Sequence, residues 1–127
     1  MLSSCGINND LNDITADIAT SSVVFKSERG FGNDRFDIYS FSLKKPKVIS
    51  NFHQVSEESE RFFRDHIGMI DIELMNDPSR ASSLRNDIDK AKNQEDGQYL
   101  YLNLNGTSKL YVYSPTLNMG YCLILVI

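Results

Sequence analysis

Tyr121-Cys-Leu-Ile-Leu-Val-Ile127 is the longest apolar run in the chain, and Met119 and Gly120 precede it. Successive side chains of a strand point to opposite faces, so a strand of this composition is apolar on both faces. Such a strand is typically buried on both sides, and we therefore expect it at the centre of a covered sheet. The run is far too short to cross a bilayer as a helix.

Two more strands are expected directly before this run. Residues 99–104 alternate leucine with polar or aromatic residues, Asn105-Gly106 marks a tight turn, and residues 110–113 return before Ser114-Pro115 ends the pairing. The end of the chain therefore predicts an antiparallel meander. We also expect its tyrosines to form a ladder on one face, either packed or exposed to a partner. They are Tyr99, Tyr101, Tyr111 and Tyr113.

Near the other end of the chain, residues 23–25 and 35–43 predict a β-hairpin, because both are rich in β-branched and aromatic residues. The second strand changes phase, with Phe36 on one face and Phe41 on the other. This change indicates either a β-bulge or a strand buried on both faces at its centre.

Two helices are expected between the hairpin and the meander. Ser56 is a candidate N-cap for the first, whose apolar stripe reaches Leu74 and which Gly68 interrupts. Residues 70–74 also alternate as in a strand, which is the competing interpretation. Asp77-Pro78 opens the second helix, with a capping carboxylate before a proline at the first helical position.

The order of elements is thus two strands, two helices and three strands. This order predicts the α+β class, with an antiparallel sheet of about five strands and two helices packed on one face. Residues 23–127 would form this single domain. Residues 1–22 are rich in Asn, Asp, Ser and Thr, and are expected to form either a short amphipathic helix or a polar tether.

Composition and motifs exclude several functions. The net charge of −4 provides no basic field for a nucleic-acid backbone. His53 and His66 have no second ligand at metal-site spacing, and no serine stands in a nucleophile motif. Gly30 and Gly32 lack the third glycine and following helix of a phosphate loop. We therefore expect no enzyme, cofactor, metal site or nucleic-acid partner.

The tip of the first hairpin is the candidate site for a protein partner. It combines guanidinium groups, an aromatic ring and an amide, which are residue types that dominate interface energy. The residues are Arg29, Phe31, Asn33 and Arg35.

Cys5 and Cys122 are the two cysteines. Cys122 lies in the apolar run and is expected to be a buried, inert thiol. Leu2-Ser3-Ser4-Cys5-Gly6 resembles the lipobox of bacterial lipoproteins, with a leucine three residues before the cysteine and small residues around it. The resemblance implies acylation of Cys5, a signal segment upstream of Leu2, and an address in the bacterial envelope facing the periplasm.

Two functional hypotheses follow. In the first, the chain is a small non-enzymatic protein-interaction domain, anchored to a membrane only through a lipid on Cys5. It would act on another protein as an inhibitor, an immunity factor or an assembly accessory. In the second, it is a cytosolic α+β module that binds a small ligand or a protein, and Cys5 is an ordinary residue.

Overall fold

The computed structural model describes residues 9–27 and 35–127. A short 3-10 turn, η1, precedes the sheet and helices. In chain order the elements are η1 (Asn9–Leu11), β2 (Ile18–Lys26), β3 (Arg35–Leu43), α1 (Glu57–His66), α2 (Met69–Glu73), α3 (Pro78–Lys92), β4 (Gln98–Leu104), β5 (Thr107–Ser114) and β6 (Met119–Val126).

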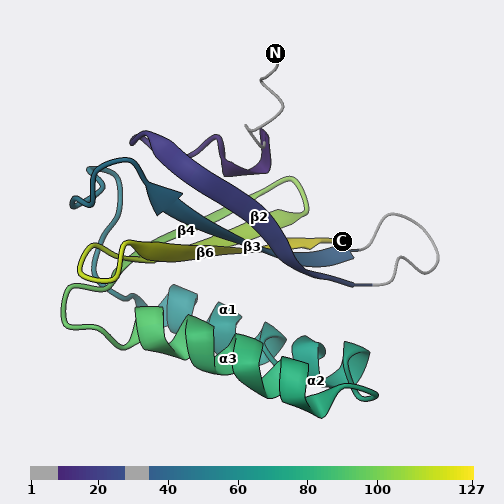
Figure 1. The fold of residues 1–127 in the computed structure, drawn as a ribbon. Helices are drawn as coiled ribbons and strands as arrows, with labels where there is room; N and C mark the ends of the chain where they lie inside the picture. The colour runs from purple at the N-terminus through teal and green to yellow at the C-terminus, as the bar shows by residue number, and fades with distance from the viewer. Residues whose placement is uncertain (1–8, 28–34) are drawn as a thin grey trace.

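The strands form one sheet in the order β2-β3-β6-β5-β4, and every neighbouring pair is antiparallel. All three helices lie on one face of this sheet, and η1 lies on the other (Figure 1). We call the face opposite the helices the open face. The α+β class, the antiparallel sheet and the helical layer on one face are confirmed.

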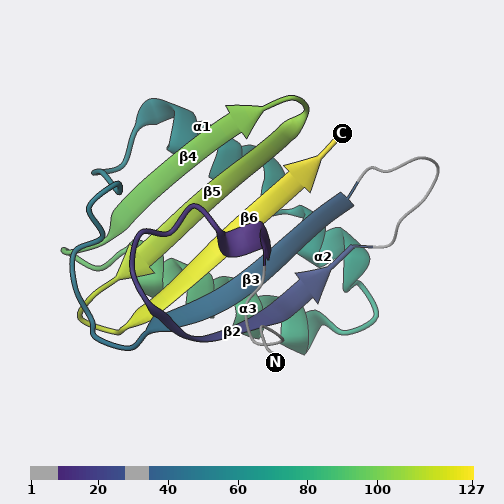
Figure 2. The same cartoon turned by 90° about the horizontal axis from the view of Figure 1, so that it is seen from above.

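β6 is the central strand, as its apolar run predicts (Figure 2). Leu123 pairs with Ile38 of β3 and Leu110 of β5, and all three are fully buried under the helices. Cys122 pairs with Tyr39 and Tyr111 on the open face, where it is also fully buried. β6 therefore contributes to two separate hydrophobic clusters, one on each side of the sheet.

β3 is likewise buried on both faces. Phe36 packs under the helices and Phe41 on the open face, and the pairing with β6 runs without a register shift from Arg35 to Phe41. The change of apolar phase therefore reflects burial on two sides. The register shifts lie in β2, between Ile18 and Thr20 and again between Val23 and Phe25.

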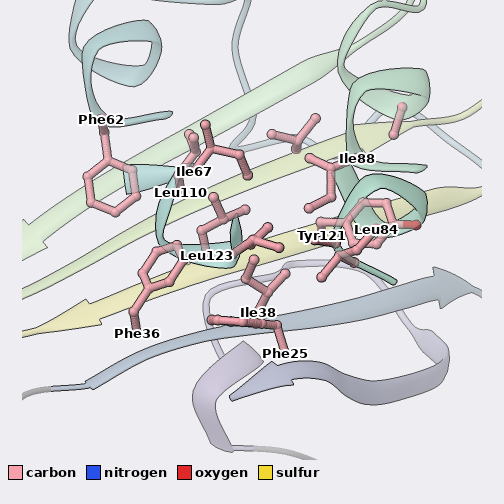
Figure 3. Packing of buried hydrophobic residues seen from close by; sticks show 14 of the residues in the cluster. Phe25, Phe36, Ile38, Phe62, Ile67, Leu84, Ile88, Leu110, Tyr121 and Leu123 are labelled. Carbon is pink, nitrogen blue, oxygen red and sulfur yellow. The ribbon is translucent and has the colours of Figure 1, made fainter. Parts of the chain in front are cut away.

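The larger cluster fills the space between the sheet and the helices (Figure 3). Ile88 of α3 and Phe62 of α1 point toward the strands, where they meet residues such as Leu110 and Leu123. The Asp77 carboxylate caps α3 by accepting a hydrogen bond from the Arg80 amide, and Pro78 lies in the first turn as expected.

α1 and α2 form the predicted interrupted helix. Ser56 caps α1 and exchanges hydrogen bonds with Ser59 in a capping box. Gly68 separates the two segments but keeps right-handed helical angles, with φ −65° and ψ −15°. The strand interpretation of residues 70–74 is wrong, because Ile70 is buried under the sheet and Leu74 continues the helical hydrogen bonding.

The described part of the N-terminal segment is not a tether. β2 begins at Ile18, which extends the first strand further upstream than the sequence predicts. Leu11 of η1 is buried on the open face beside Ile49 and Phe52, which come from the connection between β3 and α1. Residues 9–22 therefore belong to the folded domain.

The expected tyrosine ladder on one face is wrong. Leu104 pairs with Thr107 across the tight turn, so Tyr99 pairs with Val112 and Leu100 pairs with Tyr111. Side chains that are paired share a face, and neighbours along a strand alternate. The tyrosines of β4 therefore face the helices, whereas those of β5 face the open side. Tyr99, Tyr111 and Tyr113 are buried, and Tyr101 is partly exposed.

Candidate protein-interaction surface

Most residues of the predicted hairpin-tip site lie outside the described part of the chain. This applies to Arg29, Phe31 and Asn33, and also to the candidate acylated residue Cys5. Arg35 is described and opens β3. Its guanidinium donates to Asp37 at 3.0 Å and approaches Asp10 at 3.5 Å. In this network, the guanidinium group of Arg35 is therefore bonded to carboxylates of the same domain.

The same network fixes the pKa of Arg35. Burial lowers this pKa, but attraction to Asp10 and Asp37 outweighs burial and raises it above the ordinary value. The Tyr39 hydroxyl also donates to Asp10, at 2.8 Å. Arg35 therefore helps to hold the N-terminal segment on the sheet.

Asp13 forms the second attachment of this segment. It accepts a hydrogen bond from the Tyr111 hydroxyl at 2.7 Å and from the Lys109 ammonium group at 3.0 Å. Burial, with smaller contributions from Cys122 and Asp13, raises the pKa of Tyr111 far above its ordinary value. Tyr111 therefore stays protonated and acts as a donor. Together with the Arg35 network, these contacts cover the centre of the open face with residues 10–13.

Cys122 is the buried thiol that the sequence predicts. Burial raises its pKa well above the ordinary range, so the thiol remains protonated at neutral pH. Since the thiolate is the nucleophilic form, this environment suits packing and not catalysis.

The contacts of the two histidines are a backbone bridge at His53 and a ring contact at His66. The backbone of His53 bridges to β4, and the ring of His66 lies 4.7 Å from the ring of Phe62. Across residues 9–27 and 35–127, no group of three His, Cys, Asp or Glu side chains could hold a metal ion. Within the same ranges, no helix has the length and apolarity to span a membrane.

The outer edge of β4 offers unused backbone groups. His53 and Tyr99 exchange two backbone hydrogen bonds of 2.7 Å, so the amide and carbonyl of Tyr99 point outward from the sheet. The amide and carbonyl groups of successive residues in a strand point to alternate sides, so the amides and carbonyls of Tyr101 and Asn103 also point outward. No other described segment of the chain bonds to these two residues along the outer edge.

The two sheet edges differ in regularity. β2 carries two register shifts, which twist an edge strand and make it a poor template for another strand. β4 pairs with β5 without a shift from Gln98 to Leu104. β4 is therefore the better edge for strand addition.

A polar groove with one carboxylate, that of Glu58, in its lining lies on the helix side of this edge. Its volume is about 460 Å³, and Tyr101, Asn103, Ser56 and Glu58 are among its lining residues. Three glutamates begin α1, of which Glu57 pairs with Arg61 and Glu60 pairs with Lys92. No described cation pairs with Glu58. The groove therefore presents an exposed negative charge beside the β4 edge.

An apolar hollow lies on the open face beside the same edge. Its volume is about 570 Å³, and it is lined by Leu102, Leu104, Thr107 and Lys109 together with Asp13 at the limit of the N-terminal segment. Leu104 is 71% exposed although it lies in a strand. The N-terminal segment crosses the middle of the sheet and leaves the end of β4 uncovered (Figure 2).

A further hollow of about 310 Å³ lies between α2 and α3. Met75 lines it and is exposed, and Arg85 bridges to Asp71 on its lining. Arg85 and Asp71 are thus paired with each other, and Asp89 also lines this hollow. Ile72 of α2 is exposed but does not line this hollow. Ile72, at 69% exposure, is a matched comparison for Leu104.

Comparison of the chain with protein-family models, with curated proteins and with solved structures gave no match. Function is therefore inferred from the residues and their geometry.

Sequence reasoning missed the β4 surface. β4 is an edge because β6 inserts between β3 and β5, a choice of strand order that alternation in the sequence does not specify. The available signal was Leu104, an apolar residue in the expected strand that directly precedes the Asn105-Gly106 turn.

Proposed function

We propose that the chain is a small non-enzymatic protein-interaction domain whose partner contacts the end of β4. The exposure of Leu104 beside Leu102 and the apolar hollow carries this proposal. Large apolar side chains that gather in an exposed hollow with a charged rim are typical of interaction sites. Lys109 and Asp13 provide such a rim here.

Photocrosslinking in the cell that naturally produces the chain tests this proposal. A photoreactive phenylalanine analogue replaces Leu104, and a matched variant carries it at Ile72, which is equally exposed but lies on α2. We expect one discrete protein adduct from position 104 that position 72 does not give. No adduct at position 104, or the same adducts from both positions, would contradict the proposal.

We further propose that Cys5 is acylated and that the domain faces the periplasm of a bacterial envelope, where it acts as an inhibitor, immunity factor or assembly accessory. The support is the lipobox-like sequence Leu2–Gly6. The test expresses the gene with its native upstream DNA and supplies an alkyne-labelled fatty acid. The label should appear on the wild type and on Cys122→Ala, and should be absent from Cys5→Ser. An unlabelled wild type favours the cytosolic module instead.

A further inference from the structure

We propose that β4 accepts an extended segment of the partner as an additional antiparallel strand. We also infer that this segment carries basic side chains toward α1 and apolar side chains toward the open face. This inference rests on the proposed protein-binding function and names the chemistry of the partner.

The backbone of β4 provides the template. His53 already forms an antiparallel bridge with Tyr99, which demonstrates that this edge pairs with an extended backbone. In this antiparallel pairing the residues before His53 would continue beside Tyr101 and Asn103. Those residues instead turn, with the Phe52 amide bonded to the Ile49 carbonyl, and Phe52 and Ile49 pack on the open face. The outward groups of Tyr101 and Asn103 are therefore next in line. Added strands bind mainly through such backbone hydrogen bonds, and alternate side chains give specificity.

The helix side of the edge selects positive charge. In an antiparallel pair, the residues that exchange hydrogen bonds with Tyr101 and Asn103 place their side chains on the same face as these two. That face borders the groove lined by Glu58. Lysine or arginine at those positions would meet an exposed carboxylate at the start of α1.

The open face selects apolar side chains. The residues of the added strand opposite Leu102 and Leu104 point toward the hollow that these leucines line. Their burial would cover Leu104, which has little apolar contact in the free protein. The edge and the two faces together specify an extended segment in which basic and apolar residues alternate.

The probe is a synthetic peptide of alternating valine and lysine, titrated into the full chain by calorimetry or fluorescence polarisation. We expect saturable binding. Methylation of the lysine backbone amides, which would point at β4, should weaken binding about tenfold or more. Methylation of the valine amides, which would point away, should leave binding within about twofold. Equal effects of the two methylation patterns would overturn strand addition.

Two pairs of variants test the same inference by changing the protein in place of the peptide. Asn103→Pro removes an outward amide that makes no bond to β5, so it should fold and lose binding about tenfold or more. Asn103→Ala keeps the amide and should bind like the wild type. Circular dichroism checks the fold, and the methylated peptides keep the test valid if Asn103→Pro is unfolded.

The second pair of variants tests the preference for a basic segment. Glu58→Lys should weaken binding of the lysine peptide and strengthen binding of a valine–glutamate peptide. Glu73→Lys makes the same change of net charge on α2 and should do neither. If both variants act alike, the selectivity comes from net charge and the basic-segment inference is wrong.

Other outcomes are distinguishable. A wild-type dimer that dissociates in Asn103→Pro would assign the edge to a second copy of the chain and overturn the peptide inference. If no peptide binds while the adduct at position 104 persists, the domain binds a partner without strand addition. If the peptide pattern holds but no adduct forms, the edge is competent and the proposed cellular function fails.

Discussion

At the scale of single residues, the packing of the open face depends on Gly120 at the centre of the sheet. A methyl group there would overlap the ring of Phe41, which stacks on Tyr113 with 5.8 Å between ring centroids. Phe41 is buried and has Tyr111 as a second aromatic neighbour, so it has little room to move. Gly120 is therefore required to leave room for the Phe41 ring and not for backbone freedom.

Gly120→Ala should consequently lower the free energy of unfolding by about 1–3 kcal/mol, the usual cost of overpacking. Urea denaturation measures this change. Gly68→Ala is the control, because its helical backbone meets nothing near the added methyl group and alanine favours helix; it should be neutral or stabilising by up to about 1 kcal/mol. Equal stability of Gly120→Ala and the wild type would show that Phe41 has an alternative position.

Tyr121 links burial to alkaline pH. Burial, with a contribution from Asp87, raises the pKa of its hydroxyl from 10.0 to about 12. Between these values the unfolded chain loses the proton and the folded chain keeps it, so rising pH favours unfolding. The stabilising contribution is complete below pH 10.0 and is lost as pH rises through about 12.

Tyr121→Phe should therefore unfold less steeply with pH in this range, while its stability at pH 7 stays near that of the wild type. Denaturant titrations followed by circular dichroism at neutral and alkaline pH check both expectations. An unchanged alkaline slope would mean that Tyr121 titrates equally in both states.

At the scale of elements, β6 joins the two hydrophobic clusters, so its side chains carry much of the packing. Leu123→Ala removes a fully buried side chain and should lower the free energy of unfolding by about 2–5 kcal/mol. Leu104→Ala removes the same atoms from an exposed site and should change it by less than about 0.5 kcal/mol. Chemical denaturation of both variants gives the comparison, and similar losses would contradict the central place of β6.

The elements also explain what sequence reasoning could reach. The apolar run of β6, the capping residues Ser56 and Asp77 and the Asn105-Gly106 turn are local signals, and each predicted its element. The tyrosine ladder failed because register was ignored. In a two-residue hairpin an odd-numbered residue pairs with an even-numbered one, so the tyrosines of β4 and β5 must lie on opposite faces.

At the scale of the whole molecule, the sequence predicted the α+β class and the central strand but not the proposed interaction surface at β4. The surface depends on strand order and on how far residues 10–13 extend over the open face. Both are decided by contacts between distant segments, such as Lys109 with Asp13. As a result, the C-terminal end of β4 is uncovered on the open face, at Leu104. At the outer edge, no described segment bonds to the backbone groups of Tyr101 and Asn103.

Amide hydrogen exchange in β4, measured residue by residue by NMR, tests the surface most directly. In the free protein the Tyr99 amide, bonded to His53, should exchange slowly, and the outward amides of Tyr101 and Asn103 should exchange fast. The partner identified by photocrosslinking, or the valine–lysine peptide, is then added. The amides of Tyr101 and Asn103 should become protected from exchange, while the exchange rate of the Tyr99 amide changes little. Protection that appears elsewhere, with these two amides still exchanging fast, would contradict β4 as the interaction surface.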